Sequence, residues 1–328
     1  MNRREILQTG LASLSVAVLT PGVAFTQSKF PERPIRMVIP FSAGGVTDIV
    51  GRHWAERMKP HLGTIYTENQ AGGAGIVGAA EVARAQPDGH TIMLGNTSVT
   101  VLHPMTAPKL PYDPAKDFTP IAIVAVAATA LVVHASVPAK TVKEFVDYAK
   151  ANPGKLAYGS AGTGTMTHLA GEQFKQLTGL NDLTHVPYKG AGPGISDLVA
   201  GHVPVMTPNI TGQLLEFHNA GKIRIIAVFA PQRLKGAPEI PTAIELDYPN
   251  MVGQLFVGVF APHATPRTII EQYAAANHKV MDDPSFQKVL IDAGLEPVSD
   301  TPEKARAYLA EETARWAPVI KAIGLKME

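Results

Sequence analysis

Two glycine-rich turns constrain the fold of this chain more than any other feature. Each joins a short apolar, strand-like run to a run with helical periodicity, at residues 41–48 (FSAGGVTD) and 158–165 (YGSAGTGT). Helix N-termini expose unpaired N–H groups and the positive end of the peptide dipole, and glycine lets a ligand approach that backbone closely. The pattern predicts two helix starts that clamp one anion, such as a carboxylate, without an arginine.

Composition limits the classes of function. The chain has 328 residues, of which 45% are hydrophobic and 17% charged, so it can build a sizeable core and two domains. A formal net charge of +1, with no run of basic and aromatic residues, argues against nucleic acid as a partner. The absence of cysteine excludes disulfides, thiolate catalysis and cysteine-ligated metal.

The first residues predict export. Arg3 and Arg4 precede a weakly apolar stretch at residues 6–24, and small residues around 22–26 suit a cleavage site. The pair of arginines is typical of a twin-arginine signal, although the route stays open. A membrane anchor is the alternative, but polar residues, glycine and proline dilute the stretch. We expect residues 1–27 to be removed by cleavage near residues 24–27, which leaves a periplasmic protein.

Strand and helix signals alternate from residue 34 onward, as in an α/β fold with parallel sheets. Strands are predicted at residues 35–41, 64–68, 91–95, 121–134, 155–158, 183–188, 203–206, 223–229 and 255–260. Helices are predicted at residues 47–61, 76–84, 142–151, from the second turn to 178, 193–200, 213–219, and over 267–327 with breaks. Residues 112–120 are predicted to be a polar connection. Two βαβαβ units, with one strand passing from the first unit to the second and one passing back, predict two hinged lobes with a ligand cleft between them. The predicted bounds are 28–127 and 253–328 for lobe 1, and 128–252 for lobe 2.

Seven short motifs, in order along the chain, resemble those of one known family. The first lies at 31–35 (PERPI), and the others are FSAGGVTD at 41–48, ENQAGGAG at 68–75, PDGHT at 87–91, YDPAKDFTP at 112–120, GSAGTGTMTH at 159–168 and HVPYKG at 185–190. Together with the first, these resemble the Bug (TctC-type) substrate-binding proteins of tripartite tricarboxylate transporters across essentially the whole mature chain. Two departures are Ala71, where the family commonly has proline, and Gly73-Ala74, where it often has Ala-Gly.

The resemblance implies a type II periplasmic-binding-protein fold that closes on a small carboxylate. It implies no enzymatic activity, cofactor or metal; the implied partners are the membrane permease subunits of the transporter, and we expect a monomer. Family members hold one carboxylate through the turn after the first strand and the facing turn of the second lobe. The corresponding residues here are Ala43, Gly44, Gly45, Thr47 and Asp48, with Ser160, Ala161, Gly162, Thr163 and Gly164.

Several of these residues also have a structural interpretation. Asp48 suits a turn better than an anion site, because two carboxylates repel. His168 lies one helical turn after the second glycine turn and can donate to a ligand, or it can be a structural histidine. Asn96 and Ser98, which flank Thr97 at the end of the third predicted strand, are candidates at the cleft edge. The residues that contact the distal end of the ligand cannot be placed.

The motifs of other functional classes are incomplete in this sequence. An exported dinucleotide-dependent oxidoreductase is one alternative, because residues 73–78 satisfy the motif G-x-G-x-x-G. These residues follow the second strand, however, and the next strand ends without an acidic residue. A serine hydrolase motif would need glycine where Tyr158 stands. The 11 histidines form no H-x-H or H-E-x-x-H cluster. A sensory receptor with the same pocket stays open, and so does the ligand: a dicarboxylate, citrate, an aromatic acid such as terephthalate, or an amino acid.

Overall fold

A computed structural model describes residues 30–327, and all structural statements below concern these residues. The predicted export signal lies outside them. The strands are β1 (Ile35–Ile39), β2 (Ile65–Asn69), β3 (Thr91–Asn96), β4 (Phe118–His134), β5 (Ala157–Ser160), β6 (Thr184–Pro187), β7 (Val205–Met206), β8 (Ile223–Phe229), β9 (Gln254–Pro262) and β10 (Glu296–Pro297). The helices are α1 (Val46–Leu62), α2 (Ile76–Ala83), α3 (His103–Thr106), α4 (Pro114–Asp117), α5 (Val142–Ala151), α6 (Met166–Thr178), α7 (Ala191–Ala200), α8 (Gly212–Asn219), α9 (Arg267–Met281), α10 (Pro284–Asp292) and α11 (Pro302–Ile323), with short helical turns η1 (Gly73–Gly75), η2 (Ser98–Leu102) and η3 (Ile244–Leu246).

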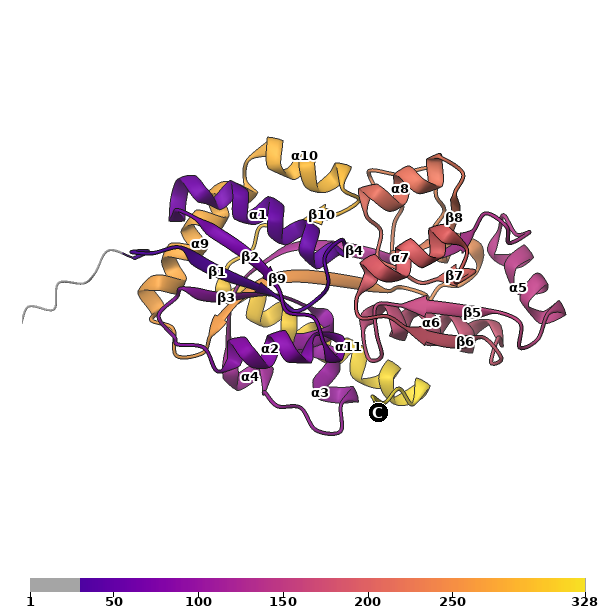
Figure 1. The fold of residues 1–328 in the computed structure, drawn as a ribbon, viewed down its shortest axis with the longest axis horizontal. Coiled ribbons are helices and arrows are strands. Elements are labelled where there is room, and N and C mark those ends of the chain that lie inside the picture. Colours follow the sequence, from indigo (N-terminus) through magenta and orange to yellow (C-terminus); the bar gives the residue numbers. More distant parts are fainter. Residues whose placement is uncertain (1–29, 328) are drawn as a thin grey trace, which may run out of the picture.

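The molecule contains two similar parallel units. In the first unit, β1 lies between β2 and β3 and is parallel to both. In the second unit, β5 lies between β6 and β7 and is again parallel to both. Figure 1 shows the two units at opposite ends of the long axis, with β4 and β9 running between them. Each glycine-rich turn follows the central strand of its unit, so both turns lie at the carboxyl ends of strands, where α/β proteins bind ligands.

The strands that connect the two units are antiparallel. The sheet order is β2-β1-β3-β9-β4-β7-β5-β6, with β8 and β10 both paired to β4. β4 pairs with β9 as far as Ala128 and with β8 from Thr129 onward, and both pairings are antiparallel. The prediction of parallel sheets was therefore wrong for the centre of the molecule, because local hydrophobic pattern does not encode the direction of a partner strand.

Helix α1 shows how a sequence pattern positions the first glycine turn. Val46, Val50, Trp54 and Met58 recur every fourth residue and are all buried, as expected for one face of a helix packed on a sheet. A Cβ atom on Gly51 would come within 2.9 Å of Ile39 and Leu94, so glycine lets the helix lie close to β1 and β3. This packing fixes the direction in which the start of α1 points.

The predicted strands and helices are confirmed, with ends that shift by a few residues. Two predictions were wrong in detail. Thr97 and Ser98, expected at the end of the third strand, lie beyond β3, where the chain continues as the π-helical turn η2 and then α3. The region 112–120, expected to be an irregular connection, contains α4, capped by the Asp113 carboxylate, and the start of β4 at Phe118. Helices α3 and α4 have four residues each, which is too few for a periodic pattern to reveal them.

Candidate functional site

A small cavity of about 30 Å³ lies between the two units, lined by residues of both. A space of this size holds about two water molecules, or one group of the size of a carboxylate. The lining residues are Phe41, Gly45, Val46, Thr47, Asn96, Ser98, Ala161, Thr165, Met166, Thr167, Ala191, Asn209 and Leu255. None of these side chains is charged, so an ion held here would be recognised by backbone N–H, hydroxyl and amide groups.

The first glycine turn brings an uncapped helix start to this cavity. Gly45 is the N-cap of α1 and offers no side chain to it, and the first helical bond runs from Ile49 N to Gly45 O. The N–H groups of Val46, Thr47 and Asp48 precede that bond. They are therefore free of helical partners and, with the helix dipole, make this end of the cavity attractive to an anion.

Asp48 holds the turn together from behind. Its carboxylate is buried and accepts hydrogen bonds from Gly44 N at 3.1 Å, from Asn69 Nδ2 at 2.9 Å and from Arg52. Burial opposes ionisation, but these donors together hold the pKa of Asp48 below its usual value. Asn69 also donates to Phe41 O, so one network ties β1, α1 and β2 together. This arrangement matches the structural interpretation of Asp48.

Three N–H groups of the second glycine turn are satisfied by side chains of the same unit. Ala161 N donates to Thr167 Oγ1 at 2.8 Å, Gly162 N donates to Ser160 Oγ at 3.1 Å, and Gly164 N donates to His168 Nδ1 at 3.1 Å. Of this turn, Ala161 and Thr165 line the cavity. The turn thus positions the start of α6, and these three amides are already paired and are not available to a ligand in the cavity.

The start of α7 also lies at the cavity. Its N-cap is Gly190, which has no capping side chain, and its first residue, Ala191, lines the cavity. The first glycine turn packs directly against it: Cβ atoms added at Gly190 and Gly192 would meet Ser42 Oγ and Ala43 O at 2.0 and 2.3 Å. The two units therefore approach each other here with backbone against backbone.

Polar groups at the end of β3 complete the first unit's side. Asn96 Nδ2 donates to Thr47 Oγ1 at 2.9 Å, while Ser98 N donates to Asn96 Oδ1 at 2.9 Å. Across the cavity, Met166 N at the start of α6 donates to Ser98 Oγ at 3.1 Å. The Thr47 and Ser98 hydroxyls act as acceptors in these bonds, so their hydrogens remain available to a ligand.

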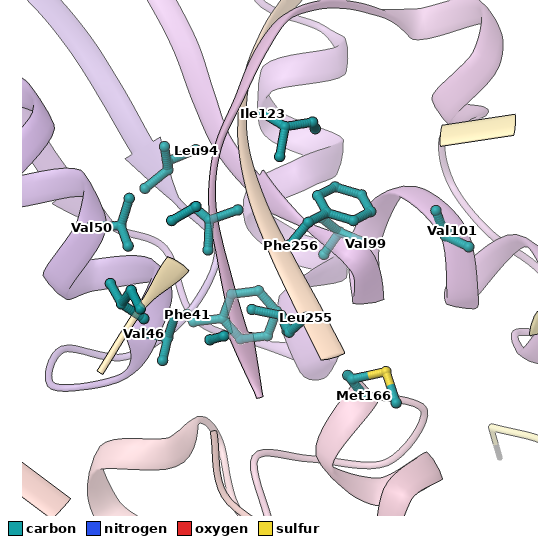
Figure 2. Packing of buried hydrophobic residues seen from close by; sticks show 14 of the residues in the cluster. Phe41, Val46, Val50, Leu94, Val99, Val101, Ile123, Met166, Leu255 and Phe256 are labelled. Carbon is teal, nitrogen blue, oxygen red and sulfur yellow. The ribbon is translucent and has the colours of Figure 1, made fainter. Parts of the chain in front are cut away.

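Apolar side chains form the rest of the wall. Phe41, Val46 and Leu255 come from the first unit and its returning strand, and Met166 from the second. Figure 2 shows these four in one buried cluster, with Met166 at the start of its helix near the ends of the strands above it. An apolar wall beside helix starts suits a small acid with a carbon skeleton.

Two histidines lie behind the second glycine turn. The rings of His168 and His185 stack with centroids 3.8 Å apart, and His185 Nε2 lies 2.7 Å from Ser160 Oγ. Burial lowers the pKa of His168 to about 4 and that of His185 to about 3. Both rings are therefore neutral at neutral pH, as the bond that His168 accepts from Gly164 requires. Neither ring lines the cavity.

The predicted site residues thus divide into two groups. The cavity brings together five of them: Gly45, Thr47, Asn96, Ser98 and Ala161. The others lie in or behind the turns and do not line it: Ala43, Gly44, Asp48, Ser160, Gly162, Thr163, Gly164 and His168. Sequence reasoning missed the rest of the lining, including Ala191 and Asn209. Gly190 and Gly192, which flank Ala191, were a usable signal for that residue, whereas no glycine-rich turn marks Asn209.

The dinucleotide-like motif has a packing role. A Cβ atom on Gly78 would lie 2.8 Å from Gln70 O and 2.9 Å from the Cα of Pro40, so this glycine lets α2 lie against the strand ends. Ala74, in the same motif, adopts the left-handed conformation with φ of 55° and packs toward Gly162 of the second unit. Within residues 30–327, no group of three or more acidic or histidine side chains is placed to bind a metal.

Comparison with known proteins places the chain. A family model described as the tripartite tricarboxylate transporter family receptor matches residues 50–325. The chain belongs to this family. The periplasmic binding protein BugD superposes on this receptor with a TM-score of 0.86 and 32% identity, over 91% of this chain and all of that one. An R. palustris protein solved with adipate has a TM-score of 0.87 and 32% identity, over 90% of this chain and 99% of that one. MatC from Rhodopseudomonas palustris, with bound malate, has a TM-score of 0.83 and 32% identity, over 89% of this chain and 100% of that one.

These matches decide several predictions. The two-lobed fold of periplasmic binding proteins and the resemblance to the Bug family are confirmed. Family members are solute-binding receptors and not enzymes, so the oxidoreductase and hydrolase alternatives are dropped. In the described part of the receptor, no helix has both the length and the apolar character of a membrane span.

Proposed function

We propose that this receptor captures a small carboxylate in the periplasm and delivers it to the membrane permease of a tripartite tricarboxylate transporter. The observation that carries the proposal is the cavity where α1 and α7 begin without capping side chains, among lining residues that carry no charge. Two uncapped helix starts supply N–H groups and dipoles of the sign that an anion requires. The solved relatives that hold adipate and malate support a carboxylate as the anion.

The energetics suit a reversible receptor. A charge-assisted hydrogen bond contributes about 1.5–3 kcal/mol, and a partly buried helix terminus adds up to about 2 kcal/mol. Four or five such bonds, less the cost of ordering, amount to roughly −8 kcal/mol, or about micromolar affinity. A receptor of this affinity collects a dilute solute and still releases it to a partner.

The lobe boundaries belong to the same proposal. We place lobe 1 at 28–127 and 253–328 and lobe 2 at 128–252, with hinges where β4 leaves lobe 1 and where the chain returns to it. The change of β4 partner between Ala128 and Thr129 supports the first boundary. The bonds from Thr129 N and Oγ1 to Gly253 O, both 2.8 Å, support the second. Rotation about this pair opens and closes the cavity, and the permease recognises the closed form.

A ligand screen tests the proposal. The mature protein, expressed from residue 28, is screened by thermal shift against malate, adipate, citrate, terephthalate and amino acids, with chloride at equal ionic strength as the control. Calorimetry then measures the affinity for each acid that raises the unfolding temperature. We expect at least one acid to bind at about micromolar Kd. If none of these acids shifts the transition, the carboxylate proposal is wrong.

A further inference from the structure

A carboxylate between two lobes needs donors from both, and the second glycine turn does not supply them for lobe 2. The N–H groups of Ala161, Gly162 and Gly164 already donate to side chains of their own lobe. The hydroxyls of Thr165 and Thr167 are also occupied: Thr165 Oγ1 donates to Gly162 O at 2.6 Å and lies 2.9 Å from Thr167 Oγ1. Apart from the backbone at the start of α7, the contacts of lobe 2 to the ligand must therefore come from another side chain.

Asn209 is a donor of the required kind. It lines the cavity, and its side chain is 6% exposed. Among the cavity-lining residues it alone has a buried side-chain nitrogen or oxygen, the Nδ2 atom, without a hydrogen-bond partner in the described chain. A buried amide left unpaired is costly, and such groups in native proteins call for a functional explanation. An acceptor atom of a ligand would satisfy it.

The backbone around Asn209 is held rigidly at the hinge. Asn209 forms a β-bridge with Thr129, the residue at which β4 changes its partner. On either side, Ala130 N donates to Pro208 O at 2.9 Å and Ile210 N donates to Ala128 O at 2.8 Å. A ligand that binds the Asn209 side chain is thereby coupled to the strand that joins the lobes.

We propose that Asn209 Nδ2 donates a hydrogen bond to the carboxylate that lobe 1 holds at the start of α1, and so supplies lobe 2's side-chain contact to the ligand. This inference rests on the proposed function and deepens it. Because an amide nitrogen donates and cannot accept, the site selects an acid whose carboxylate enters the cavity over a ligand that would present an ammonium group there. Closure is then favoured only when an acceptor oxygen is present to bridge the two lobes.

The test uses Asn209→Leu, which keeps the shape of the side chain and removes its polar atoms, and Asn209→Asp, which keeps the shape and adds a negative charge. Calorimetry with malate and with adipate measures affinity, and thermal unfolding without ligand measures stability. We expect Asn209→Leu to weaken binding by about 10- to 100-fold while the ligand-free protein is as stable as wild type or more so, since an unpaired buried group has been removed. Asn209→Asp should weaken binding further through repulsion between carboxylates.

Asn277→Leu is the matched control. Asn277 is a fully buried asparagine on α9, away from the cavity, and its Oδ1 accepts a bond from Trp54 Nε1 at 2.8 Å. This variant should lose stability and keep its affinity, the opposite of Asn209→Leu. If Asn209→Leu binds the acids with an affinity within twofold of that of wild type, the inference is overturned. If Asn209→Leu does not fold, an affinity of Asn209→Asp within twofold of wild type overturns it. A wild-type protein that binds no acid overturns the proposed function itself.

Discussion

Replacing Gly192 by alanine tests whether the contact between the first glycine turn and α7 controls closure. The added Cβ atom would lie 2.3 Å from Ala43 O, whereas real Cβ atoms keep at least 3.0 Å from such atoms. The neighbour is backbone, so the lobes must separate by about 0.7 Å at this point. Overpacking of this kind costs about 1–3 kcal/mol. The cost falls on the closed form alone, so we expect the Kd for the best acid to rise by about 5- to 150-fold.

Stability separates this effect from misfolding. Alanine in place of glycine favours a helix by up to about 1 kcal/mol, so Gly192→Ala should unfold without ligand at a temperature equal to or above that of wild type. Ser196→Ala, one turn further along the exposed face of α7, is the control and should bind as wild type does. Wild-type affinity in calorimetry for Gly192→Ala would refute the reasoning that closed lobes meet at this glycine.

Three further predictions concern stability, each measured by urea unfolding. Asp48→Ala should destabilise the protein by about 1–3 kcal/mol because its partly buried donors lose their acceptor; a loss below about 0.5 kcal/mol would contradict this role. The folded pKa values of His168 and His185, about 4 and 3, lie below the unfolded value of about 6.5, so stability is full above about pH 6.5 and falls as the pH drops toward 3. His168 should account for about 2 kcal/mol of that loss at about pH 5, and His168→Gln should remove this part of the pH dependence. Ala74→Gly should stabilise by about 0.5–1 kcal/mol by relieving its left-handed conformation, and an unchanged midpoint would argue against strain there.

Much of the fold follows from local sequence, and the exceptions have a common cause. The alternation of apolar runs and helical periodicity located the strands and helices, because each pattern reflects one buried face. The same patterns could not show that β9 and β8 run antiparallel to β4. Strand direction depends on how the chain returns after about 120 residues, which no local window contains. The short helices near residues 97–117 were missed because they have too few residues for a period.

The sequence predicted the part of the site that is built from a local backbone turn. It did not predict the parts that depend on contacts between residues far apart in the chain. The glycines at 44 and 45 indicated an open helix start after the first strand, and the structure places that start at the cavity. The second turn has the same sequence character, yet Ser160, Thr167 and His168 satisfy three of its N–H groups. Nothing in the local pattern distinguishes the two turns. Asn209 lies between a two-residue strand and α8, without a glycine-rich turn to mark it as a ligand site, so only the folded chain shows that it reaches the cavity.

The position of β9 has a consequence for the order in which this chain can fold. β3 and β4 are consecutive strands in the sequence, but β9 lies between them in the sheet and pairs with both. A growing chain that has reached His134 holds β1 to β4 and still lacks the strand that joins β3 to β4. The second unit, with β5 to β8, is complete at Phe229, before β9 begins at Gln254. The part of the protein that is synthesised first is therefore the last to close its sheet.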